Sequence, residues 1–389
     1  MTFVSQPNDE KMKKKVLTVT AGIFALLSGF GQTSNDVLNL LTQKQVITQQ
    51  EADSLRADAS IKQQESDAKK KWFPVNAGKG LQINGYTQVR YQFLEQTGKV
   101  NGFDIRRARL DIKSNVSPYW GYRLQFDVAN SPKVLDAYAE LKLKDYLNFQ
   151  LGQFKVPYSI EGLTLSNKYE FIDASLVVDA LTARKIDVIG DQQGYDIGLQ
   201  AGGSFVKIND LNLIEYKVGI FNGSGLNVAD NLKEKDVVGR LVFHPIKGID
   251  FGGFAYKGYG FYNSNSSKTT KVDVHDRNRY GAELSAEFKA ASFKAEFIEG
   301  KDGNILRNGY YVAVGYFLLP QKLQILAKYD TYDPNIGKDN TKDHLANYTG
   351  VVNYNFNPTT RIQVGYTVKK EEAKEIKNNQ IAVQLQVGF

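Results

Sequence analysis

The chain of 389 residues contains no cysteine, three histidines and two methionines. The absence of cysteine excludes disulfides, thiol catalysis, thiolate metal ligands and lipid attachment through a cysteine. Lysine and arginine total 49 against 42 acidic residues, a bias too weak to indicate binding of nucleic acid. We therefore expect no nucleic-acid partner, and no motif in the sequence predicts a cofactor or a metal ion.

No apolar stretch is long enough to cross a membrane as a helix, and the mean hydropathy is −0.38. A low mean is also what membrane β-strands give, because alternate side chains face lipid and water. At the C-terminus, Ile381, Val383, Leu385, Val387 and Phe389 alternate with polar or small residues. This ending resembles the last strand of bacterial outer-membrane β-barrels, whose terminal aromatic residue is part of the signal to the assembly machinery.

The same period of two recurs from residue 79 onward, and the segments have the spacing of tilted membrane strands with their turns. Short turns are expected at 115–118, 144–146, 244–248, 289–292, 319–322 and 357–359. Longer connections are expected between them, at 95–102, 156–192, 221–234, 259–278, 299–308, 331–344 and 370–380, while 129–133 and 202–210 break the rhythm. We predict an all-β fold, a transmembrane antiparallel β-barrel of about 16 strands in the lipid of a Gram-negative outer membrane. The barrel should occupy residues 79–389.

The N-terminus has the pattern of a secretion signal. Met12 and three lysines precede an apolar run that ends in small residues at Gly29 and Gly31. We place cleavage after Gly31, so that residues 1–31 form a signal peptide, with 1–11 as an upstream extension.

Residues 32–78 predict a short periplasmic helical segment followed by a linker. Apolar residues recur there at helical spacing, and Thr48 and Glu51 have the spacing of a capping box. Two roles remain open for this segment. It either contacts the same segment of other subunits or the cell wall, or it is an inert spacer.

The connection 156–192 is longer than an ordinary loop and contains the apolar run Phe171-Ile-Asp-Ala-Ser-Leu-Val-Val. It follows the fifth predicted strand, as does the third outer loop of porins, which folds inward and narrows the pore. We predict that it enters the lumen, with Arg184 and Lys185 as candidates at the constriction. The alternative is a lid that faces outward.

Three motifs carry a resemblance to a known family: Arg106-Arg-Ala-Arg-Leu110, Leu151-Gly-Gln-Phe-Lys-Val-Pro-Tyr-Ser159, and Gly219-Ile-Phe-Asn-Gly-Ser-Gly225 followed by Gly239-Arg-Leu241. With these motifs, residues 79–389 resemble the phosphate-selective porins O and P. The resemblance implies a homotrimer of barrels that conducts small anions past arginine and lysine side chains. The chain departs from the family pattern at Asp173 in the long loop and at Tyr195, near positions where the family usually has arginine. These departures predict modest anion selectivity without a tight phosphate site.

Strand phase turns a set of basic side chains toward the lumen, where they are candidates for contact with anions. These pore-lining candidates are Arg90, Arg107, Arg109, Lys113, Arg123, Lys142, Lys217 and Arg240. Arg107 and Arg109 lie two residues apart and point the same way, as a pair of donors suited to oxyanions. Asp111, Asp127 and Asp136 share that face, so a mixed-charge network of the barrel wall is the alternative.

No enzymatic activity is expected, because the histidines lie in predicted turns and loops without the partners of a catalytic triad. The aspartates between 330 and 343 lack the spacing of a calcium loop. We predict a passive diffusion channel for small solutes with a modest preference for anions such as phosphate. The other function left open is a structural or interaction barrel of an outer-membrane complex, with a closed pore.

Overall fold

The structure is a computed structural model that describes residues 34–44, 46–48, 51–52, 75–76, 80–96, 98–262, 273–337, 343–374 and 376–389. The chain divides into two units, Met1–Lys71 and Trp72–Phe389. The predicted signal peptide lies outside the described residues. Among the described helices, none has the length and apolar character needed to cross a membrane.

The first unit contains helix α2, which spans Ser34–Gln43. The predicted capping box beyond it is confirmed. The backbone N–H of Thr48 donates to the Glu51 carboxylate at 2.8 Å, and the N–H of Glu51 donates to the Thr48 hydroxyl at 3.2 Å. Each side chain thus satisfies a backbone donor at the start of a helix.

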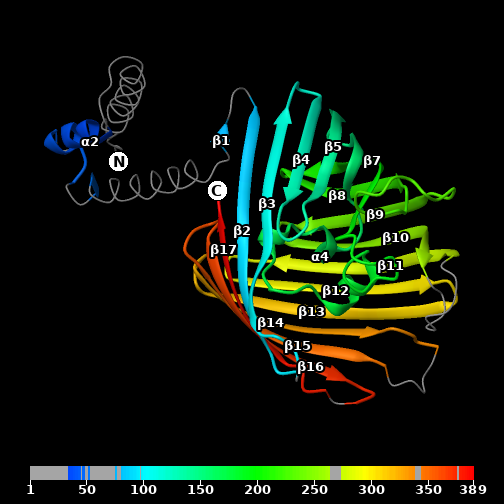
Figure 1. Cartoon of the computed structure of the whole chain (residues 1–389). Helices are drawn as coiled ribbons and strands as arrows, with labels where there is room; N and C mark the ends of the chain where they lie inside the picture. Colours follow the sequence, from blue (N-terminus) through cyan, green and yellow to red (C-terminus); the bar gives the residue numbers. More distant parts are fainter. Residues whose placement is uncertain are drawn as a thin grey trace, which may run out of the picture. The chain divides into compact units, whose positions relative to one another are not determined.

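The second unit is a closed antiparallel β-barrel, in which strands β2 to β17 each pair with the next and β17 returns to pair with β2 (Figure 1). A two-residue strand, β1 (Val75–Asn76), pairs with β2. The barrel strands are β2 (Leu81–Leu94), β3 (Gly102–Asn115), β4 (Trp120–Asp127), β5 (Lys133–Lys144), β6 (Leu147–Lys155), β7 (Tyr195–Ile208), β8 (Leu211–Phe221), β9 (Asp236–Ile246), β10 (Ile249–Tyr262), β11 (Asp273–Glu287), β12 (Ala291–Asp302), β13 (Ile305–Leu319), β14 (Leu323–Asp333), β15 (Leu345–Asn355), β16 (Arg361–Glu371) and β17 (Gln380–Gly388). The predicted fold class is therefore confirmed.

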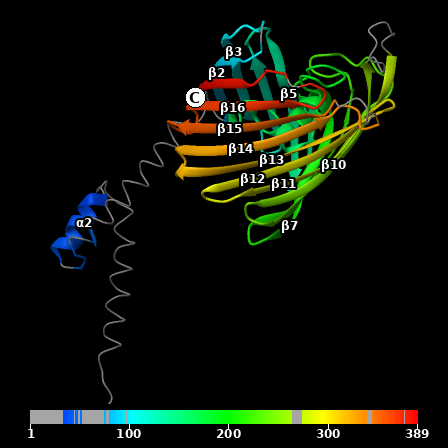
Figure 2. The same cartoon turned by 90° about the horizontal axis from the view of Figure 1, so that it is seen from below.

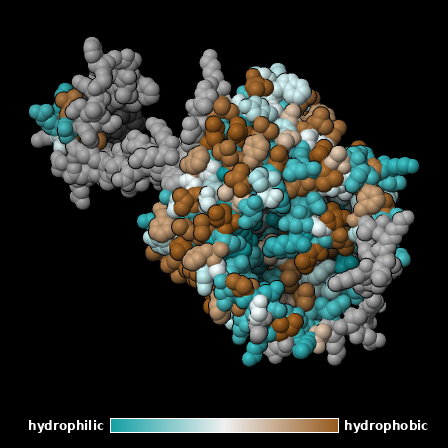
Figure 3. Space-filling model, viewed as in Figure 1, coloured by the Kyte–Doolittle hydropathy of each residue, from teal (hydrophilic) through white to brown (hydrophobic). Residues whose placement is uncertain are grey.

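The strands bury polar side chains and expose apolar ones, the reverse of a soluble protein. On β17, Gln384 and Gln386 are 2% and 3% exposed, whereas Leu385 and Val387 are 42% and 51% exposed. The outward face is apolar because it contacts lipid, and the inward face is polar because it borders the lumen. Figure 3 shows hydrophilic residues gathered in the hollow of the barrel, with hydrophobic residues around it. Figure 2 shows β12 to β16 side by side along one wall.

Two predicted connections are wrong. Residues 202–210 were expected to form a long inner turn, but β7 continues to Ile208 and β8 begins at Leu211, so the turn consists of Asn209 and Asp210. Residues 299–308 were expected to form a long loop, but β12 continues to Asp302 and β13 begins at Ile305, so the turn consists of Gly303 and Asn304. Gly303 has a φ of 58°, a left-handed conformation that favours glycine in so tight a turn.

The long connection between β6 and β7 lies inside the barrel, which confirms the predicted inward fold. It contains the helix α4 (Ile160–Leu163), the 3-10 helix η1 (Ser166–Lys168) and the helix α5 (Leu176–Leu181). Figure 1 shows α4 within the ring of strands. Val177 and Val178 of its apolar run are buried against the wall at 0% exposure, as is Leu181 after the run. A Cβ on Gly309 of β13 would lie 2.9 Å from the Val177 side chain, so the wall accommodates α5 by close approach of its backbone.

Candidate functional site: the constriction around the inward loop

The end of the inward loop is fixed to β11 by a buried ion pair. Arg277 donates to both carboxylate oxygens of Asp187, at 3.0 and 2.8 Å. Burial raises the pKa of Asp187, but Arg277 and Arg279 outweigh it, so the pKa lies below its usual range. Arg279 also donates to the Leu181 carbonyl at 3.0 Å. A bidentate pair of this kind sets orientation as well as distance, so the loop end has one defined position.

Asp173, at the tip of the loop, is a second anchor. Its carboxylate lies 2.8 Å from Arg106, 3.4 Å from Arg90 and 3.8 Å from Lys185, and it accepts from Gln380 at 3.1 Å. Burial raises the pKa of Asp173, but Arg106, Lys185 and Arg90 outweigh it and hold the pKa well below its ordinary range. Asp173 is therefore ionised and neutralises part of the positive charge of the lumen.

Arg106 is a lumen residue that the sequence pattern missed. The register of β2 and β3 shifts between Gln88 and Val89, which oppose Arg107 and Ile105, so Arg106 is an extra residue in β3. A β-bulge of this kind breaks the alternation of sides. Arg106 and Arg107 therefore both reach inward, whereas a period of two allowed only Arg107. A single sequence gives no reliable signal for a bulge. Two adjacent arginines on a membrane strand are nevertheless unusual, because regular alternation would place one of them on the lipid face.

Arg107 and Arg184 share one aromatic ring. Their guanidinium carbons lie 6.0 and 5.7 Å from the centre of the Tyr169 ring. Arg107 donates to the Gln88 side chain at 2.8 Å, and Arg184 donates to the Tyr169 hydroxyl at 2.6 Å. Among the described residues, neither guanidinium has a carboxylate within ion-pair distance. No ion pair among the described residues therefore neutralises them, and they have donors left over for a passing anion.

Most of the other predicted candidates pair with acidic residues of the wall, as the mixed-charge alternative anticipated. The pairs are Arg90 with Asp104 at 2.7 Å, Arg109 with Asp127 at 2.9 Å, Arg123 with Asp111 at 2.7 Å and Asp136 at 3.2 Å, Lys142 with Glu140 at 3.2 Å, Lys217 with Glu215 at 3.1 Å, Arg240 with Glu283 and, at 3.7 Å, with Glu215, and Lys185 with Asp179 at 2.9 Å. Lys113 has no ion pair within the described part of the chain.

The candidates do not form one cluster but line three separate hollows. A pocket of about 250 Å³ holds six basic residues and four aspartates, and Arg107 and Arg184 are among the basic ones. A pocket of about 450 Å³ on β2 to β5, toward the short turns, is lined by Lys113, Arg123 and Lys142. A third, of about 330 Å³, contains Lys217 and Arg240. The described residues include no cluster of three or more histidine or acidic side chains suited to a metal ion.

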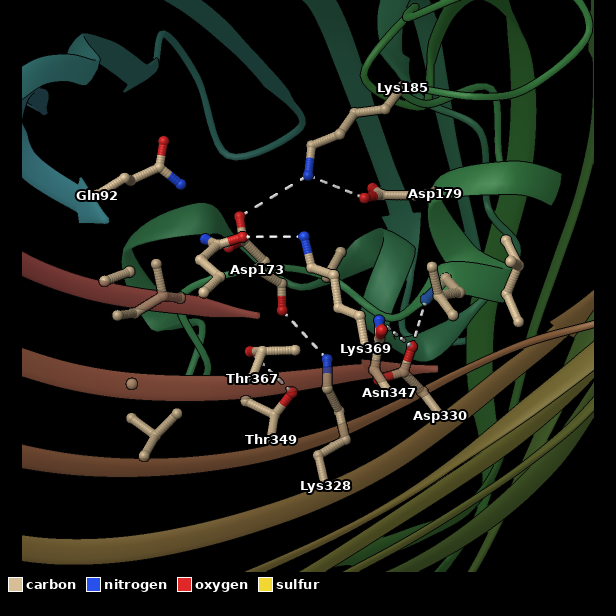
Figure 4. Close-up of a pocket in the computed structure, with 18 of the residues that line it drawn as sticks. Gln92, Asp173, Asp179, Lys185, Lys328, Asp330, Asn347, Thr349, Thr367 and Lys369 are labelled. Carbon is tan, nitrogen blue, oxygen red and sulfur yellow. Dashed lines mark hydrogen bonds and ion pairs between the residues drawn. The ribbon is translucent and has the colours of Figure 1, made fainter. Parts of the chain in front are cut away.

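A fourth pocket, of about 360 Å³, lies between the loop tip and β14 to β17 (Figure 4). It shares Arg90, Asp179 and Lys185 with the 250 Å³ pocket. The loop tip therefore has open space on two sides, one rich in arginine and one with a partly apolar wall.

Comparisons with known proteins agree with the barrel fold. A family model described as phosphate-selective porin O and P matches residues 75–260. An uncharacterized protein of Aquifex aeolicus (strain VF5) is 26% identical over 365 residues, which cover 86% of this chain and 81% of that protein. Two solved structures share the fold at 13% identity, each over 79% of this chain and 99% of the other. They are an anion-selective porin from Comamonas acidovorans (TM-score 0.59) and the trimer form of OmpT from Vibrio cholerae (TM-score 0.55).

Proposed function

We propose that this chain forms an outer-membrane diffusion channel with a modest preference for small anions. The match of residues 75–260 to the family model of phosphate-selective porins O and P supports this function. The observation that carries the proposal is the pair Arg107 and Arg184, both held on Tyr169 and neither neutralised by a carboxylate among the described residues. An anion in the 250 Å³ pocket exchanges part of its hydration for these guanidinium donors.

The preference is modest because most other lumen charges cancel. Aspartates form ion pairs with Arg90, Arg106, Arg109 and Arg123, so only a small net positive charge faces the solute. In a narrow channel the effective dielectric constant falls below that of water, which strengthens the attraction by this remaining charge. Conduction requires binding sites weak enough for the ion to dissociate again. Two guanidiniums bind an anion more weakly than a closed ring of donors, so they suit conduction better.

The path for solutes runs along β2 to β5 in this proposal, from the 250 Å³ pocket to the 450 Å³ pocket that Lys113, Arg123 and Lys142 line. The proposed activity is passive and includes no catalytic step and no cofactor. We extend it to a homotrimer, which the trimer form of the V. cholerae OmpT supports, and to delivery by the predicted signal peptide and the barrel-assembly machinery, through Phe389.

The experiment is a measurement of reversal potential in planar bilayers under a salt gradient. The variant Arg107→Gln with Arg184→Gln should move the reversal potential toward cations, while Lys322→Gln, which removes a positive charge from an exposed turn, should not. Heat-modifiable migration on gels reports the folded barrel for each protein. A cation-selective wild type, or a folded double variant with unchanged selectivity, would contradict the proposal. The absence of any current would favour the closed structural barrel instead.

A further inference from the structure

The 360 Å³ pocket between the loop tip and β14 to β17 has a polar end and an apolar wall (Figure 4). Its volume lies in the range of small-molecule sites, which run from about 300 to 1,000 Å³. Neither Arg107 nor Arg184 lines it, although both line the neighbouring 250 Å³ pocket. The question is which solute its side chains fit.

The polar end contains one cation without an acidic partner. The Lys369 ammonium donates to the Gln380 amide oxygen at 3.2 Å and has no carboxylate within ion-pair distance in the described ranges. Beside it on the same strand, the hydroxyl of Thr367 lies 3.1 Å from that of Thr349. Two hydroxyls have two hydrogens and this contact uses one, so the other is available to an acceptor. The Lys369 ammonium and the free hydroxyl of the threonine pair can together donate hydrogen bonds to one carboxylate.

Four acidic residues line the pocket, and three of them are engaged by several partners. Asp173 is held by arginine and lysine, and Asp179 pairs with Lys185 at 2.9 Å. Asp330 is 1% exposed and accepts from the Leu176 N–H at 2.8 Å. The fourth, Glu371, accepts from the Asn378 side chain with one oxygen, and its other oxygen has no hydrogen-bond partner among the described residues.

The wall beside the polar end is apolar. Ile172 of the loop lies against Gly365, where an added Cβ would meet its terminal methyl at 3.3 Å. Val351 is 3% exposed, and Leu345 and Ala382 complete this side of the pocket. An inorganic anion gains nothing from such a wall, whereas the apolar body of an organic acid loses contact with water there.

We infer that this pocket binds small monocarboxylates with an apolar body, by their carboxylate at Lys369 and the threonine pair and by their body on Ile172 and Val351. The inference rests on the proposed function only in that solutes enter the lumen. It gives the lumen two anion sites of different chemistry in two neighbouring pockets, one for any small anion and one for organic acids.

The test measures binding directly, so that it does not depend on conduction. Folded protein in detergent is titrated with benzoate, benzamide and acetate, and saturation-transfer NMR gives each half-saturation concentration. Benzoate should bind at least tenfold more tightly than either of the others, because benzamide lacks the charge and acetate lacks the apolar body. Lys369→Gln should weaken benzoate about tenfold, the effect of losing one charge-assisted hydrogen bond. Val351→Thr, which keeps the shape of the wall, should weaken benzoate several-fold and leave acetate unchanged.

Lys322→Gln is the matched control, because it removes the same charge from an exposed turn and should leave benzoate binding unchanged. Equal binding of benzoate and benzamide, or equal benzoate binding by Lys369→Gln and wild type, would overturn the inference. If Lys369→Gln fails the heat-modifiability test, the Val351→Thr variant and the comparison of ligands decide. Benzoate binding without any chloride current in bilayers would support this site and count against the proposed channel. Chloride current without benzoate binding would support the proposed channel and overturn the inference about this pocket.

Discussion

Arg106 donates to Asp173 at 2.8 Å, joining the bulge of β3 to the tip of the inward loop. A strict period of two places Arg106 on the lipid face, so this pair exists only because the strand carries an extra residue. It has two consequences for a channel. It holds the loop tip against β3, and it removes the charge of a guanidinium that would otherwise attract anions.

The first prediction follows from that pair. Asp173→Asn keeps the shape of the side chain but leaves Arg106 without a carboxylate partner among the described residues, whereas Arg90 stays paired with Asp104 and Lys185 with Asp179. The reversal potential should move toward anions, in the direction opposite to that of the Arg107 and Arg184 variant. Asp210→Asn, in the exposed turn between β7 and β8, removes the same charge and should have no such effect. An unchanged reversal potential in a folded Asp173→Asn barrel would mean that Asp173 acts only on structure.

The second prediction separates Arg109 from Arg107. The Arg109 side chain is 5% exposed and pairs at 2.9 Å with Asp127, whose side chain is 9% exposed. Arg109→Gln leaves that carboxylate without its partner and should cost about 3 kcal/mol of unfolding free energy. Arg107→Gln breaks no ion pair and should cost less than about 1.5 kcal/mol, the range of one net hydrogen bond. Denaturant unfolding in detergent measures both, and equal losses would contradict the division into wall and solute residues.

The third prediction concerns the pore size. Deleting residues 165–185 removes η1, the loop tip and α5 from the lumen, and single-channel conductance should rise because the open cross-section grows. Heat-modifiable migration must be retained for the comparison to hold. An intact barrel with unchanged conductance would show that the loop, although inside, does not limit the flow of ions.

The fourth prediction concerns assembly. Phe389 closes the barrel through its backbone, which donates to the Gly85 carbonyl at 2.9 Å and accepts from the Gly85 N–H at 3.3 Å. Its side chain is 55% exposed on the lipid face. Deleting Phe389 should lower the amount of protein in the outer membrane and leave the conductance of the channels that do assemble unchanged. A normal amount in purified outer membranes would rule out a role for this residue in assembly.

The fifth prediction is the mature N-terminus. The basic residues after Met12, the apolar run and the small residues at Gly29 and Gly31 predict cleavage that leaves Gln32 first. N-terminal sequencing of protein extracted from outer membranes tests this directly, and a chain that begins at Met1 or Met12 would contradict it.

The sequence by itself determined the barrel, because the alternation of side chains is a local property of each strand. A lipid face must be apolar along its whole length, so β17 shows its membrane orientation in its own residues. The same locality made Arg107 and Arg109 predictable as inward residues. It also made the 156–192 connection stand out, because an apolar run in so long a loop has to be buried against something.

Only the tertiary structure decided which inward charges are free and which are neutralised. Arg109 and Arg107 are equivalent by phase, yet Asp127 opposite Arg109 in β4 neutralises one of them, and no carboxylate of the described residues reaches the other. Cross-strand partners depend on register, and register depends on bulges such as the one that turns Arg106 inward. The convergence of Arg184 and Arg107 on Tyr169, and of Asp173 on Arg106, joins residues far apart in the chain. Those contacts arise from the path of a folded loop inside a closed barrel, and no local pattern encodes that path.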